Sequence, residues 1–245
     1  MTEYVQGIDV ASYQSSDLTQ IIDAYQPGHV VVRLYIPGEY PKPSHSLAQI
    51  ASARQNGTTV GGYIWGYRTF SPEHSIAAAV DLCRQANLLL PILWIDCETY
   101  GSPVTDPGPD AEWLRRAKAS ADLLGMKLGI YTGVWWADSY FPGGQDAFQE
   151  FADWPLWLAD YRAWSHPSAV PKPRGFHDPL AGWQYSGTGV DRDLFDKRWT
   201  VYTVEQPEPC GAELAKVARV QAIADAKPYR PPSKRKLMEA LRSDN

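Results

Sequence analysis

The sequence is poor in cysteine, and its three cysteines are far apart. Cys83, Cys97 and Cys210 are odd in number, and their spacing fits neither a disulfide framework nor a zinc site. The five histidines form no pair at the helical spacing of metal ligands. We therefore expect reduced and mostly buried cysteines, synthesis in a reducing compartment, and neither a metal nor another cofactor.

Long apolar runs and an excess of positive charge are also missing. No apolar run approaches the roughly 18 residues of a membrane-spanning helix, and the first residues, MTEYVQGIDV, lack the basic start and the apolar stretch of a signal peptide. The formal net charge is -5, and basic residues do not gather on one periodic face of the main body. These absences predict no membrane span, no signal peptide and no nucleic-acid partner.

Aromatic residues, in contrast, are abundant. The 245 residues include 10 tryptophans and 14 tyrosines. Large rings dominate the burial energy of protein cores, so most of them are expected inside the fold. The others are available to stack on apolar faces such as those of sugar rings.

Short apolar runs alternate with helical patterns along most of the chain. Strands are predicted at residues 5–10, 29–36, 58–67, 91–98, 126–132, 154–161, 181–186 and 189–195. Helices are predicted at residues 17–25, 45–57, 71–87 and 109–125, with Ser71 as a cap and with Gly57 and Gly125 as stops. Repeated βα units favour a parallel sheet of the α/β class, and their number favours a closed barrel. The closely spaced strands after residue 150 predict that this barrel is irregular.

The character of the chain changes near residue 205. We predict a barrel domain over residues 1–204 and a linker with a helical, basic extension over residues 205–245, because EQPEPCG is Pro-rich and residues 212–226 have helical spacing. Residues 230–245 contain five basic residues and two acidic ones. This segment is either a solvated tail or a docking arm for a partner protein or an anionic wall polymer.

Two acids stand at the end of the apolar strand in PILWIDCETYG. Side chains at positions i and i+2 of a strand share a face, so Asp96 and Glu98 are expected on one side and Cys97 on the other, in apolar packing. The carboxyl ends of parallel barrel strands form the active site of such folds. Two adjacent carboxylates repel each other, which raises the pKa of one of them and suits it to donate a proton.

Other predicted strands also end near acids, namely Asp9, Asp160, Asp191 and Asp193. Each alone could be a structural acid that caps a helix or pairs with an arginine, the candidates being Arg33, Arg68, Arg162 and Arg192. Several acids at one barrel mouth are costly and favour a chemical role. Aromatic residues lie close to the same strand ends: Tyr63, Trp65, Tyr131, Trp157, Tyr161, Trp183 and Tyr185. Acids and rings in one cleft are typical of carbohydrate-processing enzymes.

Five stretches carry a family resemblance. GIDVASYQ, WIDCE, GIYTG followed by WW, PLWLADY and GWQYSGTGVDRDLF, in this order, resemble the family 25 glycoside hydrolases over about residues 5–196. These are lysozymes of the N-acetylmuramidase type from bacteria and bacteriophages. The resemblance implies a flattened barrel of five βα units followed by three further strands. It also implies hydrolysis of the β-1,4 bond between N-acetylmuramic acid and N-acetylglucosamine in peptidoglycan.

The same resemblance assigns roles to single residues. Glu98 resembles the proton donor, and Asp96 the second acid, which either attacks the sugar or supports attack by the substrate's own acetamido group. Asp9 and Asp191 match positioning and charge-tuning acids, whereas Asp193 is a weaker match. Substrate contacts are expected from five aromatic residues, Tyr63, Trp65, Tyr131, Tyr161 and Trp183. The sequence departs from the family pattern by offering Glu39 where an aspartate is usual, and Ile64 where a histidine is often found.

Three functions therefore compete. The first is a muramidase that degrades bacterial cell walls during phage lysis or entry, held in the host cytoplasm until lysis or carried in the virion, where residues 205–245 could contact virion proteins. The second is a non-catalytic component of a phage particle that binds walls or has a structural role. The third is a glycosidase for another N-acetylated glycan such as chitin.

Overall fold

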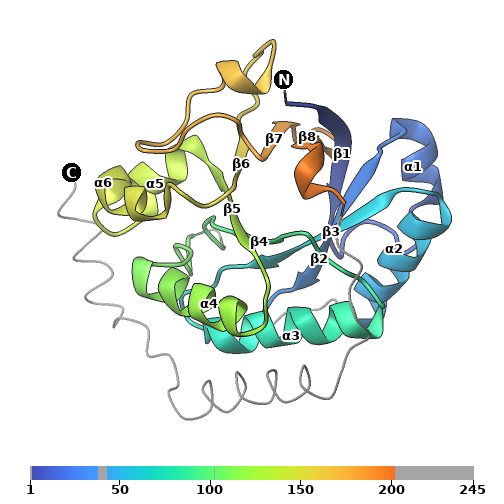
Figure 1. Ribbon diagram of the computed structural model, residues 1–245, viewed down its shortest axis with the longest axis horizontal. Helices are drawn as coiled ribbons and strands as arrows, with labels where there is room; N and C mark the ends of the chain where they lie inside the picture. Colours follow the sequence, from blue (N-terminus) through green and yellow to red (C-terminus); the bar gives the residue numbers. More distant parts are fainter. Residues whose placement is uncertain (1, 38–42, 102, 202–245) are drawn as a thin grey trace.

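The computed structural model of the chain describes residues 2–37, 43–101 and 103–201. Eight strands form a closed barrel in which each strand pairs with the next along the chain, and the last pairs with the first (Figure 1). The strands are β1 (Tyr4–Val10), β2 (His29–Tyr35), β3 (Thr59–Trp65), β4 (Leu93–Asp96), β5 (Leu128–Gly133), β6 (Leu156–Ala159), β7 (Gly182–Ser186) and β8 (Asp191–Asp196).

Five βα units precede the last three strands, as predicted. The helices are α1 (Thr19–Tyr25), α2 (Pro43–Gln55), α3 (Pro72–Gln85), α4 (Ala111–Leu123), α5 (Val134–Tyr140) and α6 (Gly144–Phe148). Three short 3-10 turns cover Gln149–Phe151, Pro167–Ala169 and Lys197–Trp199. The helices follow one another around the outside of the barrel, whereas β7 and β8 face loops and turns (Figure 1). The predicted cap of α3 is present, because the Ser71 side chain accepts a hydrogen bond from the backbone N–H of His74.

Two features of the second half of the barrel differ from the sequence prediction. Helices α5 and α6 were not predicted, because both are short and neither N-cap makes a side-chain hydrogen bond. Strand β8 runs antiparallel to both β7 and β1, whereas the βα pattern had favoured a parallel sheet. The link between β7 and β8 is too short for the crossover that a parallel neighbour would need, so β8 folds back as a hairpin partner.

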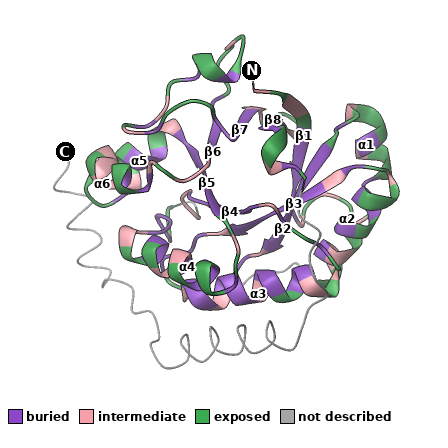
Figure 2. Ribbon diagram, in the orientation of Figure 1, coloured by how far each residue is buried: buried purple, intermediate pink, exposed green. Residues whose placement is uncertain are grey.

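Side chains alternate between two apolar layers. One layer fills the barrel itself and includes Val31, Ile92, Trp94, Trp157 and Phe195. The other lies between the strands and the helices, and Figure 2 shows these strands and the inner helix faces as buried. Cys83 and Cys97 belong to this outer layer, and for Cys97 the position in the strand predicted it. Both cysteines are free thiols. Cys210 lies outside the described residues.

The described residues also bear on membranes and domain limits. None of their helices has the length and apolar character needed to cross a membrane. The barrel is complete by Asp196, within the predicted domain of residues 1–204. The predicted extension over residues 205–245 and the departure at Glu39 both lie outside the described residues.

Candidate active site

Four acids from three of the predicted strands meet at one mouth of the barrel. Asp9 lies near the end of β1, and Asp96 is the last residue of β4. Asp191 reaches the same mouth because β8 is antiparallel, so that its first residue pairs directly with Asp9. Glu98 follows β4 by two residues. All four line one cavity of about 280 Å³.

Glu98 lies two residues beyond the end of β4, but its side chain points to the same side as that of Asp96, as the spacing predicted. Strand β4 ends at Asp96, and the backbone N–H of Cys97 still donates a hydrogen bond of 2.8 Å to the carbonyl of Tyr131 on β5. This bond continues the extended backbone for one more residue. Cys97 consequently points into the outer apolar layer, and Glu98 faces the cavity together with Asp96.

Burial is the main reason why the pKa values of the carboxyls of this cavity are raised. It raises the pKa of Glu98 to about 7, with a further contribution from the charge of Asp191. It raises the pKa of Asp9 to about 8, again helped by Asp191. The pKa of Asp96 also lies well above its ordinary value, first because of burial and then because of the charge of Glu98. The predicted repulsion between Asp96 and Glu98 therefore contributes to the raised pKa of Asp96, but burial contributes more.

One cation lies among these acids. Arg33 at the end of β2 lines the cavity, and its charge acts to lower the pKa of Asp96. Its guanidinium also donates a hydrogen bond to the hydroxyl of Ser12. From the sequence, Arg33 was only one of four arginines that could pair with a structural acid.

Gln184 on β7 connects the acids to two tyrosines. Its Nε2 donates a hydrogen bond of 2.7 Å to Oδ2 of Asp9. Its Oε1 accepts hydrogen bonds from the hydroxyls of Tyr131 at 2.9 Å and Tyr161 at 2.5 Å. Gln184 was not predicted from the sequence, although its place between Trp183 and Tyr185 in an alternating strand was a usable signal.

Four of the five expected aromatic contacts lie at the mouth, and one does not. Tyr63, Trp65 and Tyr131 line the cavity of the acids, and Tyr161 lies just beside it. Trp183 is buried in the outer layer, where its indole N–H donates a hydrogen bond of 2.9 Å to the carbonyl of Asp160. The structure thus does not bring Trp183 to the mouth, because alternation along β7 turns Gln184 inward and Trp183 outward.

Asp160 behaves as a structural acid. Its carboxylate oxygens accept hydrogen bonds from Nε of Arg162, at 2.8 and 3.1 Å, and from Nη2 of the same side chain, at 2.5 Å. This pairing is the alternative that the sequence left open. It fixes the turn after β6 beside the mouth.

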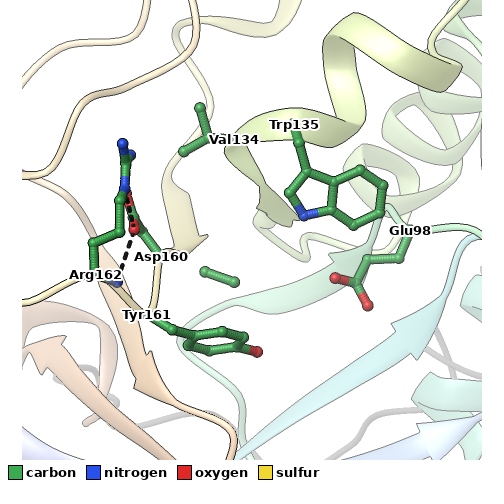
Figure 3. Close-up of a pocket in the computed structure, with 7 residues that line it drawn as sticks. Glu98, Val134, Trp135, Asp160, Tyr161 and Arg162 are labelled. Atoms are coloured by element: carbon green, nitrogen blue, oxygen red, sulfur yellow. Dashed lines mark hydrogen bonds and ion pairs between the residues drawn. The ribbon is translucent and has the colours of Figure 1, made fainter.

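A second cavity, of about 400 Å³, opens on the other side of Glu98. Its lining consists of Glu98, Val134, Trp135, Ala159, Asp160, Tyr161 and Arg162 (Figure 3). Figure 3 shows the Glu98 carboxyl between the indole of Trp135 and the ring of Tyr161, with Arg162 turned towards Asp160. The two rings are 52% and 59% exposed, so both are free to contact a ligand. Glu98 is the acid that the two cavities share.

The loop that follows Glu98 is tied to the rest of the mouth by Asp106. This buried carboxylate accepts hydrogen bonds from the backbone N–H groups of Arg68, Thr69 and Gly108, at 3.2, 3.1 and 2.8 Å. Gly108 adopts a φ of +91°, and a Cβ there would lie 2.6 Å from the carbonyl oxygen of Glu98. The close approach of these two backbone segments therefore requires a glycine.

Within the described part of the chain, no group of three or more His, Cys, Asp or Glu side chains is arranged to hold a metal ion. The chemistry that the site offers is that of carboxyl groups with raised pKa values beside aromatic rings. Such a set can donate a proton and stabilise positive charge on a sugar.

Comparison with solved structures shows the same fold in several proteins. The modular autolysin LytC from Streptococcus pneumoniae, in complex with a synthetic peptidoglycan ligand, is 17% identical with a TM-score of 0.60, over 79% of this chain and 47% of that one. The modular Cpl-1 endolysin, complexed with a peptidoglycan analogue, is 17% identical with a TM-score of 0.57, over 85% of this chain and 58% of that one. GHIP, a glycosyl hydrolase 25 of Streptococcus pneumoniae, is 15% identical with a TM-score of 0.56, over 78% and 87%. This chain thus spans about half of the length of the two modular proteins.

Sequence comparison gives the family. No curated protein matches the chain at a significant level. The sequence model described as Glycosyl hydrolases family 25 matches residues 8–194. This match covers most of the chain and includes all four acids of the first cavity, and the chain therefore belongs to the glycosyl hydrolases of family 25.

Proposed function

We propose that the chain is a peptidoglycan hydrolase of the N-acetylmuramidase type. It would cleave the β-1,4 bond between N-acetylmuramic acid and N-acetylglucosamine. One observation carries the proposal: Asp9, Asp96, Glu98 and Asp191 line a single cavity, and Glu98 also borders a second cavity with exposed aromatic rings. The peptidoglycan ligands bound by LytC and Cpl-1, which share the fold, support the choice of substrate.

Glu98 is the proton donor in this proposal. Its pKa of about 7 leaves a large fraction of the carboxyl protonated near neutral pH. Because Glu98 borders both cavities, the glycosidic oxygen would lie beside its carboxyl, with one sugar ring in each cavity. Protonation of that oxygen lets the bond to the anomeric carbon break.

The two cavities then receive different sugars. Positive charge develops on the ring whose anomeric carbon loses the bond, and carboxylates stabilise such charge. The N-acetylmuramic acid ring would therefore occupy the cavity of Asp9, Asp96 and Asp191. The departing N-acetylglucosamine would lie between Trp135 and Tyr161, whose rings can stack on its apolar face.

Asp96 lies in the cavity of the charged ring. Either its carboxylate attacks the anomeric carbon, or it orients the acetamido group of the substrate for that attack. In both cases water, deprotonated by Glu98, would then displace the attacking group and leave a hydroxyl on the anomeric carbon as the new reducing end. Arg33 supports both routes, because its charge favours the ionised form of Asp96.

The decisive experiment compares the wild-type chain with Glu98→Gln on purified peptidoglycan. We expect wild type to clear the wall suspension and to release muropeptides with new reducing ends at muramic acid. Glu98→Gln should be slower by a factor on the order of 10²–10⁴, the usual contribution of a general acid. Glu112→Gln, at an exposed position of α4, is the matched control and should clear walls like wild type.

Equal clearing by wild type and Glu98→Gln would rule out the proposed mechanism. Wall binding without any product would instead favour the wall-binding or structural role. Turnover of chitin oligomers with inert peptidoglycan would select the third function.

We also infer a biological setting in phage lysis or entry, in which the enzyme waits in the host cytoplasm or travels with the virion and then acts on the cell wall. Mass spectrometry of purified particles distinguishes the two routes. Detection of the chain in particles supports entry, and its restriction to infected cells supports lysis.

A further inference from the structure

A fifth carboxyl lies beneath the four that line the cavity. Asp193 follows Asp191 by two positions on β8, faces the barrel interior and is 0% exposed. Its Oδ1 accepts a hydrogen bond of 2.9 Å from the indole N–H of Trp157 on β6. Among the described residues, no N–H or O–H group donates to its Oδ2. Burying an ionised carboxylate costs much free energy when one of its oxygens accepts from a single neutral donor and the other accepts no hydrogen bond.

Asp9 on β1, the neighbour of Asp193, offers a way to reduce this free-energy cost. Asp9 lies close enough to Asp193 for their carboxyl groups to act as hydrogen-bond partners, an interaction that lowers the pKa of Asp9 and raises that of Asp193. An ionised carboxylate only accepts hydrogen bonds, so this contact requires a proton on one of the two. The bare Oδ2 is satisfied when it carries that proton and donates it towards Asp9.

The surroundings decide which of the two groups holds the proton. Asp9 reaches the cavity and accepts a hydrogen bond from Gln184, which favours its ionised form. Asp193 has only the indole of Trp157 as a donor, and it has no ion-pair partner in the described part of the chain. Burial and the charges of Asp9 and Asp191 hold the pKa of Asp193 well above its usual range.

The groups around this pair come from every neighbouring strand. They are Arg33 from β2, Tyr63 from β3, Asp96 at the end of β4 with Glu98 just beyond it, Tyr131 from β5, Trp157 from β6, Gln184 from β7 and Asp191 from β8. Arg33 is the positive charge of this set, and it acts on Asp96. The set therefore leaves Asp193 with acidic or neutral partners.

We propose that Asp193 is a permanently neutral acid that donates a hydrogen bond to Asp9, which fixes the Asp9 side chain at the floor of the active site and lets it ionise at a lower pH than burial alone would allow. Asp193 touches no reacting atom in this arrangement and is a positioning residue. The hydrogen bonds from Gln184 and Asp193 act against burial, which raises the pKa of Asp9. The inference deepens the proposed function and rests on it for the activity measurements below.

The test compares Asp193→Asn with Asp193→Leu. The amide of asparagine can donate to Asp9 while its carbonyl accepts from Trp157, which reproduces the neutral acid. Leucine fills similar space and does neither. We expect Asp193→Leu to lose activity roughly ten- to a hundredfold, the usual effect of removing a hydrogen bond to a charged group. Asp193→Asn should recover most of that loss, and Asp23→Asn, on the exposed side of α1, is the matched control.

The pH profile separates positioning from a general structural effect. Without the donor, Asp9 ionises at higher pH, so the acid limb of the profile should move to higher pH in Asp193→Leu and stay in place in Asp193→Asn. Loss of activity in Asp193→Asn equal to that in Asp193→Leu would overturn the proposal, because it would mean that a negative charge at this position is needed.

A measurement without activity makes the test independent of the proposed function and of the folding of Asp193→Leu. The infrared difference spectrum between wild type and Asp193→Asn at neutral pH should contain the C=O band of a protonated carboxylic acid. A difference that contains only carboxylate bands would overturn the proposal. If the chain proves inactive on peptidoglycan but the protonated band is found, the proposed function fails and the inference about Asp193 stands.

Discussion

Gln184 on β7 and Asp9 on β1 are 175 positions apart in the chain, yet the amide of the first donates a hydrogen bond of 2.7 Å to the carboxyl of the second. Strand β8 lies between them in the sheet. The carbonyl oxygen of the same amide accepts from the hydroxyls of Tyr131 and Tyr161. Because Tyr161 lines the second cavity, one neutral side chain connects the acids of the first cavity to the rim of the second.

Replacement of this amide should affect both activity and stability. Gln184→Leu leaves Asp9 with one donor fewer and two tyrosine hydroxyls without their acceptor. We expect kcat/KM on soluble glycan strands to fall roughly ten- to a hundredfold and the free energy of unfolding to fall by about 1–3 kcal/mol. Rate measurements and urea unfolding check the two effects. Gln85→Leu, at an exposed position of α3, should change neither, and an unaltered rate in Gln184→Leu would contradict the role given to the amide.

The pH dependence of the rate should show the proton of Glu98. The group must be protonated to act, and its pKa is about 7. The rate should therefore fall as the pH rises through about 7, and the profile of Glu98→Gln should lack this limb. Hydrolysis of soluble glycan strands in buffers of constant ionic strength measures it. A rate that stays constant well above neutral pH would exclude Glu98 as the proton donor.

The same protons link stability to pH. Folding raises the pKa of Glu98 from 4.5 to about 7 and that of Asp9 from 3.8 to about 8, so the folded chain binds protons that the unfolded chain releases. The stability present below about pH 4 should therefore be lost as the pH rises towards 8. Glu98→Gln has no such group to ionise and should exceed wild type at about pH 8 by up to about 3 kcal/mol.

Urea unfolding of both proteins at about pH 5 and about pH 8 measures this difference. The gap between Glu98→Gln and wild type should widen with pH. A gap of equal size at both values would show that the buried carboxyl does not change its pKa on folding.

The exposed indole of the second cavity should matter for binding rather than for folding. Trp135 is 52% exposed and lies beside Glu98 (Figure 3). Trp135→Ala should weaken binding of a glycan that extends past the cleaved bond by about 1–2 kcal/mol, roughly 5- to 30-fold. Titration of the Glu98→Gln background with soluble glycan strands measures it without turnover.

Phe70→Ala offers the control for this change, since Phe70 is 41% exposed and lines neither cavity. It should leave glycan affinity unchanged. Equal affinity of the Trp135→Ala protein and its parent would remove the second cavity from the proposed binding site.

Much of the mouth was predictable because it depends on local geometry. The apolar run before Asp96 identified a buried strand, and the carboxyl ends of parallel barrel strands always meet at one end. The spacing of Asp96 and Glu98 then placed both on one side, and Asp9 was found by the same argument. Asp191 was likewise named among the acids near predicted strands, and the family motifs added the roles of the four acids, which remain predictions.

Trp183 was assigned to the wrong face of its strand because the sequence does not show which residues of β7 point into the barrel. Trp183 and Gln184 are neighbours in β7, and a shift of one position exchanges the inner and outer faces of a strand. The aromatic character of Trp183 suggested a sugar contact, whereas packing against the outer layer required the large ring and left the amide to face the acids.

By itself, the sequence determined the βα order of the barrel, the outward face of Cys97 and the strand end that carries Asp96 and Glu98, because these follow from side-chain periodicity within single elements. Only the tertiary structure decided that β8 runs backwards, that Gln184 spans from β7 to Asp9, that Trp135 on the unpredicted helix α5 faces Tyr161, and that Asp193 lies against Asp9 beneath the cavity. Each of these depends on which strands become neighbours when the barrel closes, and closure is set by packing between residues far apart in the chain.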